Sequence, residues 1–267
     1  MRTRAVLFMT LGILSGCRTA APPIRFAPAG TDSTILRNEY ALTAAERASL
    51  TPDNLRTLSQ EQIDQIYARL STGPLPDGPF RGDLFFPRDR DRRVLIRDMP
   101  GTLPGPLADI ATVPIEHLGK AFWRGKVFFK SQGILRNRIE DLVILRPLIK
   151  NSETIPKLTF DGQTTWLLFP ARVSCGDSLL DPAHRSIVID YAKGSEIEGY
   201  REIPDKLAGA EGLGIRDEVR RVRRGLYLGR AYFHKQFGLN FTLVDPTAAA
   251  SGPNTDEDQA DCESSSR

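Results

Sequence analysis

The chain has 267 residues, of which 40% are hydrophobic and 26% charged, with a formal net charge of +3 at pH 7. This composition is typical of a folded soluble domain. The charge is too small and too dispersed for the basic stripe of a nucleic-acid-binding protein, so we expect no nucleic acid partner.

The first 17 residues have the layout of a secretory signal peptide. Arg2 and Arg4 precede an apolar run at residues 5–14, and small residues follow it. A run of about ten residues is too short for the roughly twenty that span a bilayer. The sequence Leu-Ser-Gly-Cys, which ends at Cys17, resembles the lipobox of bacterial lipoproteins. The alternative is an ordinary cleaved signal with an incidental cysteine.

The lipobox resemblance implies both a modification and a location. It implies removal of residues 1–16, diacylation of the Cys17 sulfur and acylation of the new amino group, for example by palmitate. Arg18 follows, and in lipoproteins of the enterobacterial type a residue other than Asp there implies sorting to the outer membrane. We therefore expect a lipoprotein of the bacterial cell envelope, anchored in the outer membrane by acyl chains and facing the periplasm.

Two N-terminal segments are expected before the main domain. Residues 17–40 are rich in Ala, Pro, Thr and Gly without periodicity, which predicts a lipidated tether. A helical segment at 41–72 should follow. Thr43 and Glu46 have the spacing of a capping box, which predicts a helix start. Apolar residues at helical spacing predict a second helix within residues 59–70.

Residues 73–246 should form the main domain, an antiparallel lipocalin-like barrel or strongly curved sheet. Short runs of β-branched and aromatic residues are separated by glycines and prolines, and not by regular helices. The predicted fold class is therefore mainly β with N-terminal helices (α+β). After a first strand that begins near Gly78, strands are predicted at residues 121–130, 141–147, 157–160, 164–174, 186–191, 226–233 and 238–244.

Two further segments interrupt this pattern. Ile215, Val219 and Val222 fall at helical spacing, which predicts a helix over residues 215–222. Residues 247–267 are polar and acidic, and they should form a disordered tail.

Several segments occur in an order that is found in small barrels. A glycine–aromatic segment at residues 78–82 comes first. An Ile-Asp-Tyr strand end at 189–191, an Arg-Asp-Glu segment at 216–218 and a Leu-Gly strand at 226–230 follow. Over residues 76–245 this order resembles small lipocalin-like barrels of the Gly-x-Trp-x-Gly type. The resemblance implies a closed antiparallel barrel with an apolar interior, and it implies no particular reaction.

Aromatic and arginine side chains of the main domain are candidates for ligand binding. A barrel of about eight strands has room for a small apolar ligand, and a guanidinium binds an anionic head group well. Core packing and a structural Asp–Arg network are the alternatives. The candidates are Trp123, Trp166, Tyr191, Arg201, Arg216 and Tyr227.

Signals for catalysis and for cofactors are few. Asp190 or Asp217 could act as the general base of a periplasmic hydrolase or isomerase if its pKa were raised and it reached a substrate proton. No Cys or His spacing predicts a metal, and no motif predicts a cofactor. Cys175 and Cys262 could pair in an oxidising periplasm or stay free.

The leading hypothesis is a lipid-anchored envelope lipoprotein that binds an apolar or amphiphilic ligand, or an envelope protein, without catalysis. One alternative is the hydrolase or isomerase that uses Asp190 or Asp217. The other is a structural partner in an envelope assembly, with a basic patch as its contact surface. That patch would consist of Arg220, Arg221, Arg223 and Arg224.

Overall fold

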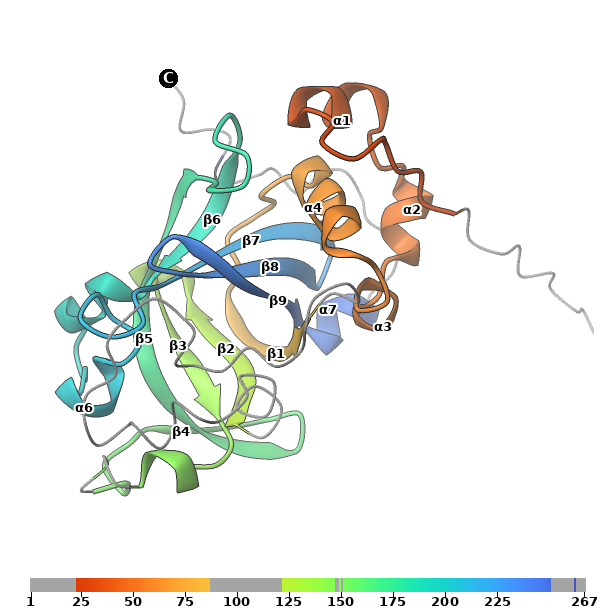
Figure 1. Ribbon diagram of the computed structural model, residues 1–267. Helices are drawn as coiled ribbons and strands as arrows, with labels where there is room; N and C mark the ends of the chain where they lie inside the picture. The colour runs from red at the N-terminus through yellow and green to blue at the C-terminus, as the bar shows by residue number, and fades with distance from the viewer. Residues whose placement is uncertain (1–22, 87–121, 147–148, 150, 251–261, 263–267) are drawn as a thin grey trace, which may run out of the picture.

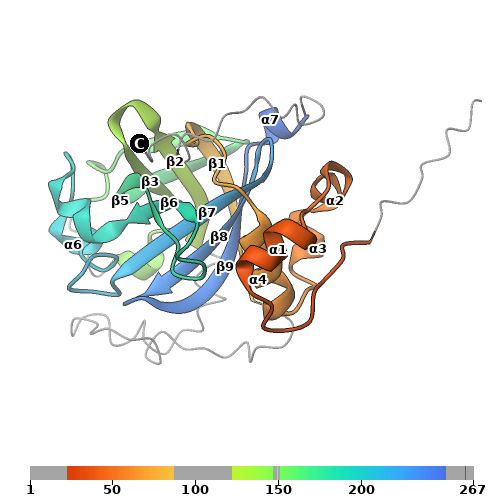
Figure 2. The ribbon, with the colours of Figure 1, turned by 90° about the horizontal axis from the view of Figure 1, so that it is seen from above.

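The computed structural model describes residues 23–86, 122–146, 149, 151–250 and 262. A curved antiparallel sheet forms the centre of the molecule, and helices from the N-terminal part of the chain cover one side of it (Figures 1 and 2). The helices are α1 (Ser33–Glu39), α2 (Ala44–Ser49), α3 (Pro52–Leu55), α4 (Gln60–Arg69), α6 (Glu202–Asp205) and α7 (Pro246–Ala250), with short 3-10 turns η4 (Lys130–Gln132), η5 (Val143–Leu145) and η6 (Tyr191–Glu196). The strands are β1 (Gly78–Phe85), β2 (Trp123–Phe129), β3 (Ile134–Ile139), β4 (Lys157–Phe160), β5 (Gln163–Asp177), β6 (Arg185–Asp190), β7 (Ile215–Arg223), β8 (Leu226–Phe233) and β9 (Gln236–Val244).

Eight strands of the described residues close into a barrel. Their order is β3-β2-β1-β9-β8-β7-β6-β5, and β5 pairs with β3 to complete the ring. The remaining strand, β4, pairs with the first residues of β5. Closure removes unpaired sheet edges. The prediction of a mainly β, antiparallel lipocalin-like barrel with N-terminal helices is therefore confirmed.

The barrel wall separates two main apolar cores. The inner core fills the barrel and includes Phe80, Phe128, Tyr191, Tyr227 and Phe241. The outer core lies between the wall and the N-terminal helices, where apolar residues of α4 pack on β7 and β8. Its buried residues include Ile63, Ile66, Tyr67, Leu70, Val222, Leu226 and Leu228.

The two predicted N-terminal helices are confirmed. The hydroxyl of Thr43 accepts a hydrogen bond from the backbone N–H of Glu46, and the Glu46 carboxylate accepts one from the N–H of Thr43. Ser59 and Gln62 form the same reciprocal cap at the start of α4. These caps satisfy backbone donors that would otherwise lack partners at a helix start.

The tether predicted over residues 17–40 is folded within its described part, so that prediction is wrong there. Helix α1 begins at Ser33, and Leu36 on this helix is buried. Upstream, the side-chain amide of Gln65 accepts from the N–H of Ala27 and donates to its carbonyl. Local sequence propensity did not predict that these residues are ordered, because their ordered structure depends on contacts with α4. Cys17 lies outside the described residues.

The helix predicted over residues 215–222 is wrong, since this segment forms β7. The side chains of Asp217 and Val219 point into the barrel, whereas Glu218 and Arg220 lie on its outer face. All four are buried, so both faces of the strand are covered. The apolar spacing resembled a helix because polar residues occupy buried positions on this strand.

The strand predicted at residues 141–147 is also wrong. Residues Val143–Leu145 form η5, and the carboxylate of Asp141 accepts a hydrogen bond from the N–H of Val143, which favours a turn. Sequence reasoning missed β3, whose inward positions include the polar Asn137. The other predicted strands are confirmed, with ends that shift by at most three residues.

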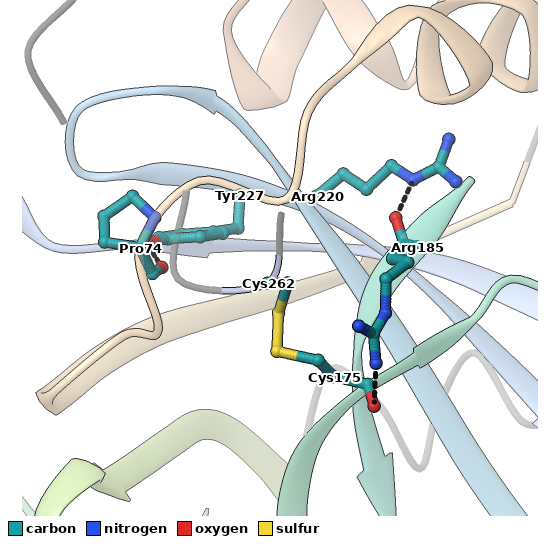
Figure 3. The surroundings of a disulfide bond; sticks show 6 residues. All are labelled: Pro74, Cys175, Arg185, Arg220, Tyr227 and Cys262. Carbon is teal, nitrogen blue, oxygen red and sulfur yellow. Dashed lines mark hydrogen bonds between the residues drawn. A yellow bond between two sulfur atoms is a disulfide. The ribbon is translucent and has the colours of Figure 1, made fainter. Parts of the chain in front are cut away.

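The pairing of Cys175 and Cys262, which sequence reasoning left open, is present as a disulfide with a Cα–Cα distance of 5.3 Å. Figure 3 shows Cys262 against β5, where Arg185 donates a hydrogen bond to the carbonyl of Cys175. Cys262 is fully buried. The tail predicted to be disordered over residues 247–267 is therefore anchored to the barrel at Cys262, and residues 247–250 belong to helix α7 (Pro246–Ala250), so the prediction is wrong at both places.

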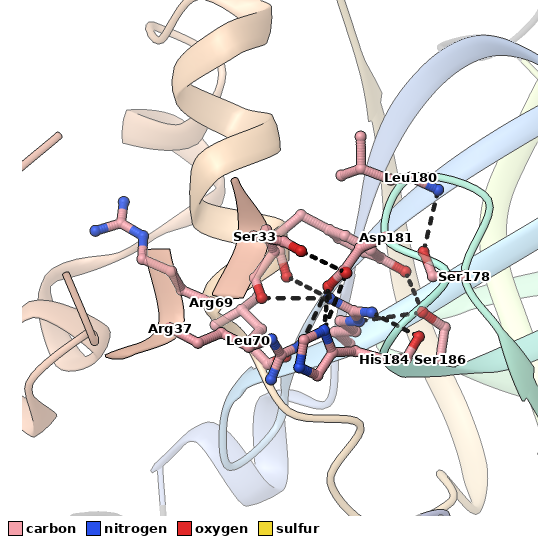
Figure 4. Close-up of polar contacts among 12 residues, drawn as sticks. Ser33, Arg37, Arg69, Leu70, Ser178, Leu180, Asp181, His184 and Ser186 are labelled. Carbon is pink, nitrogen blue, oxygen red and sulfur yellow. Dashed lines mark hydrogen bonds and ion pairs between the residues drawn. The ribbon is translucent and has the colours of Figure 1, made fainter. Parts of the chain in front are cut away.

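Asp181 joins helix α1 to the barrel wall (Figure 4). Its carboxylate accepts from Ser33 Oγ at 2.8 Å and lies 2.9 Å from His184 Nδ1. It also pairs with Arg37 at 3.7 Å and with Arg220 at 3.3 Å. The guanidinium of Arg220 is fully buried, so this residue belongs to the interior and not to an exposed basic patch.

We expect Asp181→Asn to lower the free energy of unfolding by about 3 kcal/mol, because it leaves the buried Arg220 without its counter-charge. Denaturant unfolding measures this change. The matched control is Asp53→Asn, whose side chain is 94% exposed in the wild-type protein. The control should change stability by less than about 0.5 kcal/mol.

The loss of stability caused by Asp181→Asn should also depend on pH. Burial alone would raise the pKa of Asp181, but hydrogen bonds from His184 and Ser33 and the charge of Arg220 outweigh burial and hold the pKa below 3.8. The carboxylate form therefore favours the folded state, and its stabilisation is lost only as the pH falls through that lowered pKa. A difference between wild type and Asp181→Asn that vanished near neutral pH would contradict this assignment.

Candidate functional site

A charged side chain lies at the centre of the barrel. Lys126 on β2 is 2% exposed, and its Nζ lies 2.7 Å from Asp217 Oδ2. The same nitrogen donates to the Tyr191 hydroxyl at 2.6 Å and to Asn137 Oδ1 at 3.0 Å. We call Lys126, Asn137, Tyr191 and Asp217 the core polar network.

Strand alternation explains why these four residues meet. Lys126 and Asn137 are direct partners in the antiparallel pairing of β2 with β3, so both side chains share the inner face. Asp217 is an inward position of β7, paired with Ile189 on β6. Tyr191 lies two residues further along and therefore points to the same side.

Aromatic rings enclose the ammonium group. Lys126 Nζ lies 5.3 Å from the ring centroids of Trp123 and Phe241 and 5.2 Å from that of Tyr191, within the range of cation–π attraction. Phe241 packs over Gly229, where an added Cβ would come within 2.2 Å of its ring. In the described part of the chain, these side chains fill the middle of the barrel.

Burial changes the proton affinity of the network. It lowers the pKa of Lys126, and the charge and hydrogen bond of Asp217 oppose that shift only in part. Burial likewise raises the pKa of Tyr191 well above its ordinary range, so its hydroxyl keeps its proton at neutral pH. Burial therefore makes the Lys126 ammonium a stronger acid than a lysine in water, and the Asp217 carboxylate lies 2.7 Å from it.

The structure brings three of the sequence candidates together and separates the rest. Trp123, Tyr191 and Asp217 lie at the core polar network, with the Trp123 indole N–H donating to Asn137 Oδ1 at 2.8 Å. Asp217 pairs with a lysine that sequence reasoning did not single out, and not with the expected arginines.

The other candidates lie at separate places. Asp190 accepts the backbone N–H of Ala192 at the start of η6. Arg216 pairs with Glu218, and the Tyr227 hydroxyl donates to the carbonyl of Pro74, as Figure 3 shows. Two more lie near β4 and β5: Trp166 under the ammonium of Lys157, and Arg201 bound to the carbonyl of Thr154.

A groove lies on the outside of the barrel between β2, β3 and β5 and the turn that contains η6. Its volume is about 480 Å³, which falls in the range of small-molecule sites. We call it the outer groove. It is lined by Phe129, Gln132, Ile134, Arg136, Pro156, Arg172, Glu196, Ile197, Glu198 and Gly199.

The outer groove combines apolar surface with two arginines. Arg136 is half-buried and donates to the carbonyl of Glu198. Burial lowers the pKa of Arg136, although the nearby Asp205 opposes the shift, and a guanidinium stays protonated throughout. Arg172 pairs with Glu196 at 3.9 Å, with both side chains substantially exposed. Such a pair is weak and exchanges readily for a stronger anionic partner.

Sequence reasoning missed Lys126, Asn137, Arg136 and Arg172. For Lys126 the local signal was weak, because only one of the residues two positions away, Phe128, is apolar, and the other is Arg124. For the two arginines no local signal existed, since β3 was not predicted and the groove forms only when η6 packs beside it.

The described residues set two further limits. Among the described residues, no group of three or more His, Cys, Asp and Glu side chains is arranged to hold a metal ion. In the same part of the chain, no helix is long and apolar enough to cross a membrane.

Comparisons with known proteins give one likeness. No family model and no curated protein matches the chain. One solved structure that matches is the crystal structure of a protein from Thermomonospora curvata, at 18% identity and a TM-score of 0.33. The match covers 72% of this chain and 90% of that chain. A likeness this distant carries no conclusion about function.

We expect Gly229→Ala to lower the free energy of unfolding by about 1–3 kcal/mol, because its methyl group would collide with the ring of Phe241 inside the barrel. Gly209→Ala is the matched control, since an added Cβ there meets its nearest atoms at an ordinary 3.5 Å. Denaturant unfolding of both variants tests this. Equal stability of the two variants would contradict this prediction, because it would mean that the barrel interior can accommodate an additional methyl group at residue 229.

Proposed function

We propose that the protein is a lipid-anchored envelope lipoprotein that binds an amphiphile with an anionic head group in the outer groove. The observation that carries this proposal is the combination, in one groove of about 480 Å³, of apolar side chains and two arginines. Phe129, Ile134 and Ile197 would contact the apolar chain of the ligand. Arg136 and Arg172 would bind its carboxylate or phosphate, because the planar guanidinium forms paired hydrogen bonds with either group.

The groove is a better candidate for this ligand than the barrel interior. Inside the barrel, the rings of Trp123 and Phe241 surround Lys126 at contact distance. A ligand would have to displace them and also leave the charges of Lys126 and Asp217 in new surroundings, which costs several kcal/mol. The outer groove is already open to solvent and requires no such change.

The anchoring half of the proposal rests on the lipobox-like sequence that ends at Cys17. The Cys175–Cys262 disulfide supports an exported location, because disulfides persist in oxidising compartments such as the periplasm. The acyl chains would hold the folded domain at the membrane surface, where amphiphiles are abundant.

Replacement of Cys17 by Ala should abolish incorporation of labelled palmitate and release the protein from the membrane fraction, because the acyl chains are its proposed anchor. Metabolic labelling and fractionation of cells measure both effects. The control is Cys262→Ser, which removes a cysteine elsewhere and should keep the label. Label that persisted in Cys17→Ala would contradict the lipobox assignment.

For ligand binding, we expect Arg136→Met to weaken the affinity of a long-chain fatty acid by about tenfold, equivalent to roughly 1.4 kcal/mol. The affinity of the fatty alcohol of equal chain length should stay unchanged, because it lacks the charge that Arg136 would bind. Titration of the non-acylated Cys17→Ala protein with fluorescent fatty acid, and displacement by each unlabelled compound, measures this.

The matched control for that titration is Arg81→Met, an exposed arginine on β1 that pairs with Asp161 at 3.4 Å and does not line the groove. It should bind the fatty acid as the parent protein does. No binding by the parent, or equal weakening by both substitutions, would contradict the proposal.

A further inference from the structure

The core polar network places an amine beside a side-chain amide. Lys126 Nζ lies 3.0 Å from Asn137 Oδ1, and the two residues are direct cross-strand partners. Two contacts fix which way the amide of Asn137 faces. Its oxygen accepts from the Trp123 indole N–H at 2.8 Å, and its nitrogen donates to the carbonyl of Phe169 at 3.1 Å. The amide is therefore held with its oxygen against Nζ, and the amide carbon is one bond away from that oxygen.

The neighbouring groups match the needs of acyl transfer from an amide to an amine. Asp217 Oδ2, 2.7 Å from Nζ, can accept the proton of the lysine. The Tyr191 hydroxyl lies 3.2 Å from that carboxylate oxygen and 2.9 Å from Asn137 Nδ2, so it connects the base to the nitrogen that would leave. The Trp123 N–H already points at the oxygen on which negative charge would develop.

The surroundings favour attack on the Asn137 amide by the amine of Lys126 over hydrolysis of that amide by water. Lys126 and Asp217 are 2% and 4% exposed, and aromatic rings cover the ammonium. Burial lowers the pKa of Lys126, which increases the share of neutral, nucleophilic amine. The nucleophile and the amide are held at contact distance, which removes most of the entropic cost of their meeting.

We propose that Lys126 and Asn137 form an intramolecular amide bond that covalently joins β2 to β3. Neutral Nζ attacks Asn137 Cγ after its extra proton passes to Asp217. The Nζ–Cγ bond forms, and the Cγ–Nδ2 bond breaks. Nδ2 leaves as ammonia with the proton that Tyr191 relays from Asp217, and the carboxylate of Asp217, free again, takes the one further proton that Nζ loses. No oxidant, metal or cofactor takes part. Trp123, Tyr191 and Asp217 are catalytic residues of this step, because each touches a reacting atom.

This inference is independent of the outer groove, because it concerns the inner face of the barrel. It also assigns a use to a buried lysine that a ligand-binding role leaves unexplained. Among the described residues of the network, the same amine could join Asp217 with loss of water, or it could stay an ion pair. The mass of the product separates these three outcomes.

The test is mass spectrometry of the folded Cys17→Ala protein after reduction of its disulfide. We expect an intact mass lower than the sequence mass by one ammonia. Trypsin should release a species in which residues 125–130 are joined to residues 137–138, uncleaved at Lys126. An unchanged mass overturns the proposal, and loss of one water would overturn the assignment to Asn137. Loss of ammonia without the joined peptides, as in succinimide formation, would also overturn it.

Substitutions at Asp217 and Tyr191 show whether these residues catalyse bond formation or only pack in the barrel. Asp217→Asn should retain the full mass, because the proton acceptor is lost. If that variant fails to fold, Tyr191→Phe keeps the ring and removes only the relay, so bond formation should slow at least about tenfold in a time course after refolding, equivalent to roughly 1.4 kcal/mol in the barrier. Asp53→Asn is the control and should lose ammonia as the parent does. Full, rapid bond formation in Asp217→Asn or Tyr191→Phe would overturn the roles of these residues.

Discussion

The ion pair between Lys126 and Asp217 is the interaction on which the inner arrangement of the barrel depends. Removing an ammonium and a carboxylate from water costs several kcal/mol for each ion, so the two must remain in contact. Tyr191 and Asn137 provide the other hydrogen bonds that the pair needs. A slip of β2, β3 or β7 by one residue would move one of these side chains to the outer face. The network therefore specifies the register of strands on opposite sides of the barrel.

The same network explains why a barrel of this size need not be a ligand carrier. Eight strands enclose a space that side chains can fill, and here large rings fill it around the lysine. Small residues make this possible, since Gly82 lies under Trp123 and Gly229 lies under Phe241. Binding capacity is then left to the outer surface, where η6 packs beside β3 and β5 and leaves a groove between them.

The fold could be predicted from the sequence more completely than the candidate site. Most strands are apolar runs between turn residues, so local pattern alone locates them. The exceptions are β3, which was not predicted, and β7, where Asp217, Glu218 and Arg220 are buried with partners that lie far away in the sequence. Lys126 and Asn137 were missed for a related reason. Their meeting depends on the register of β2 against β3, and short-range pattern does not specify register.

Three arginines of the described residues contribute almost nothing to the surface of the protein. Arg138, Arg220 and Arg230 are each at most 3% exposed, and they lie over aromatic rings or donate to backbone carbonyls. A guanidinium suits this position because its planar fork satisfies several acceptors at once. For these three residues, formal charge therefore overstates the positive charge that is available at the surface. Arg136 and Arg172 differ from these three because they are only partly buried and border a groove, which is why they are the arginines to which we assign a ligand.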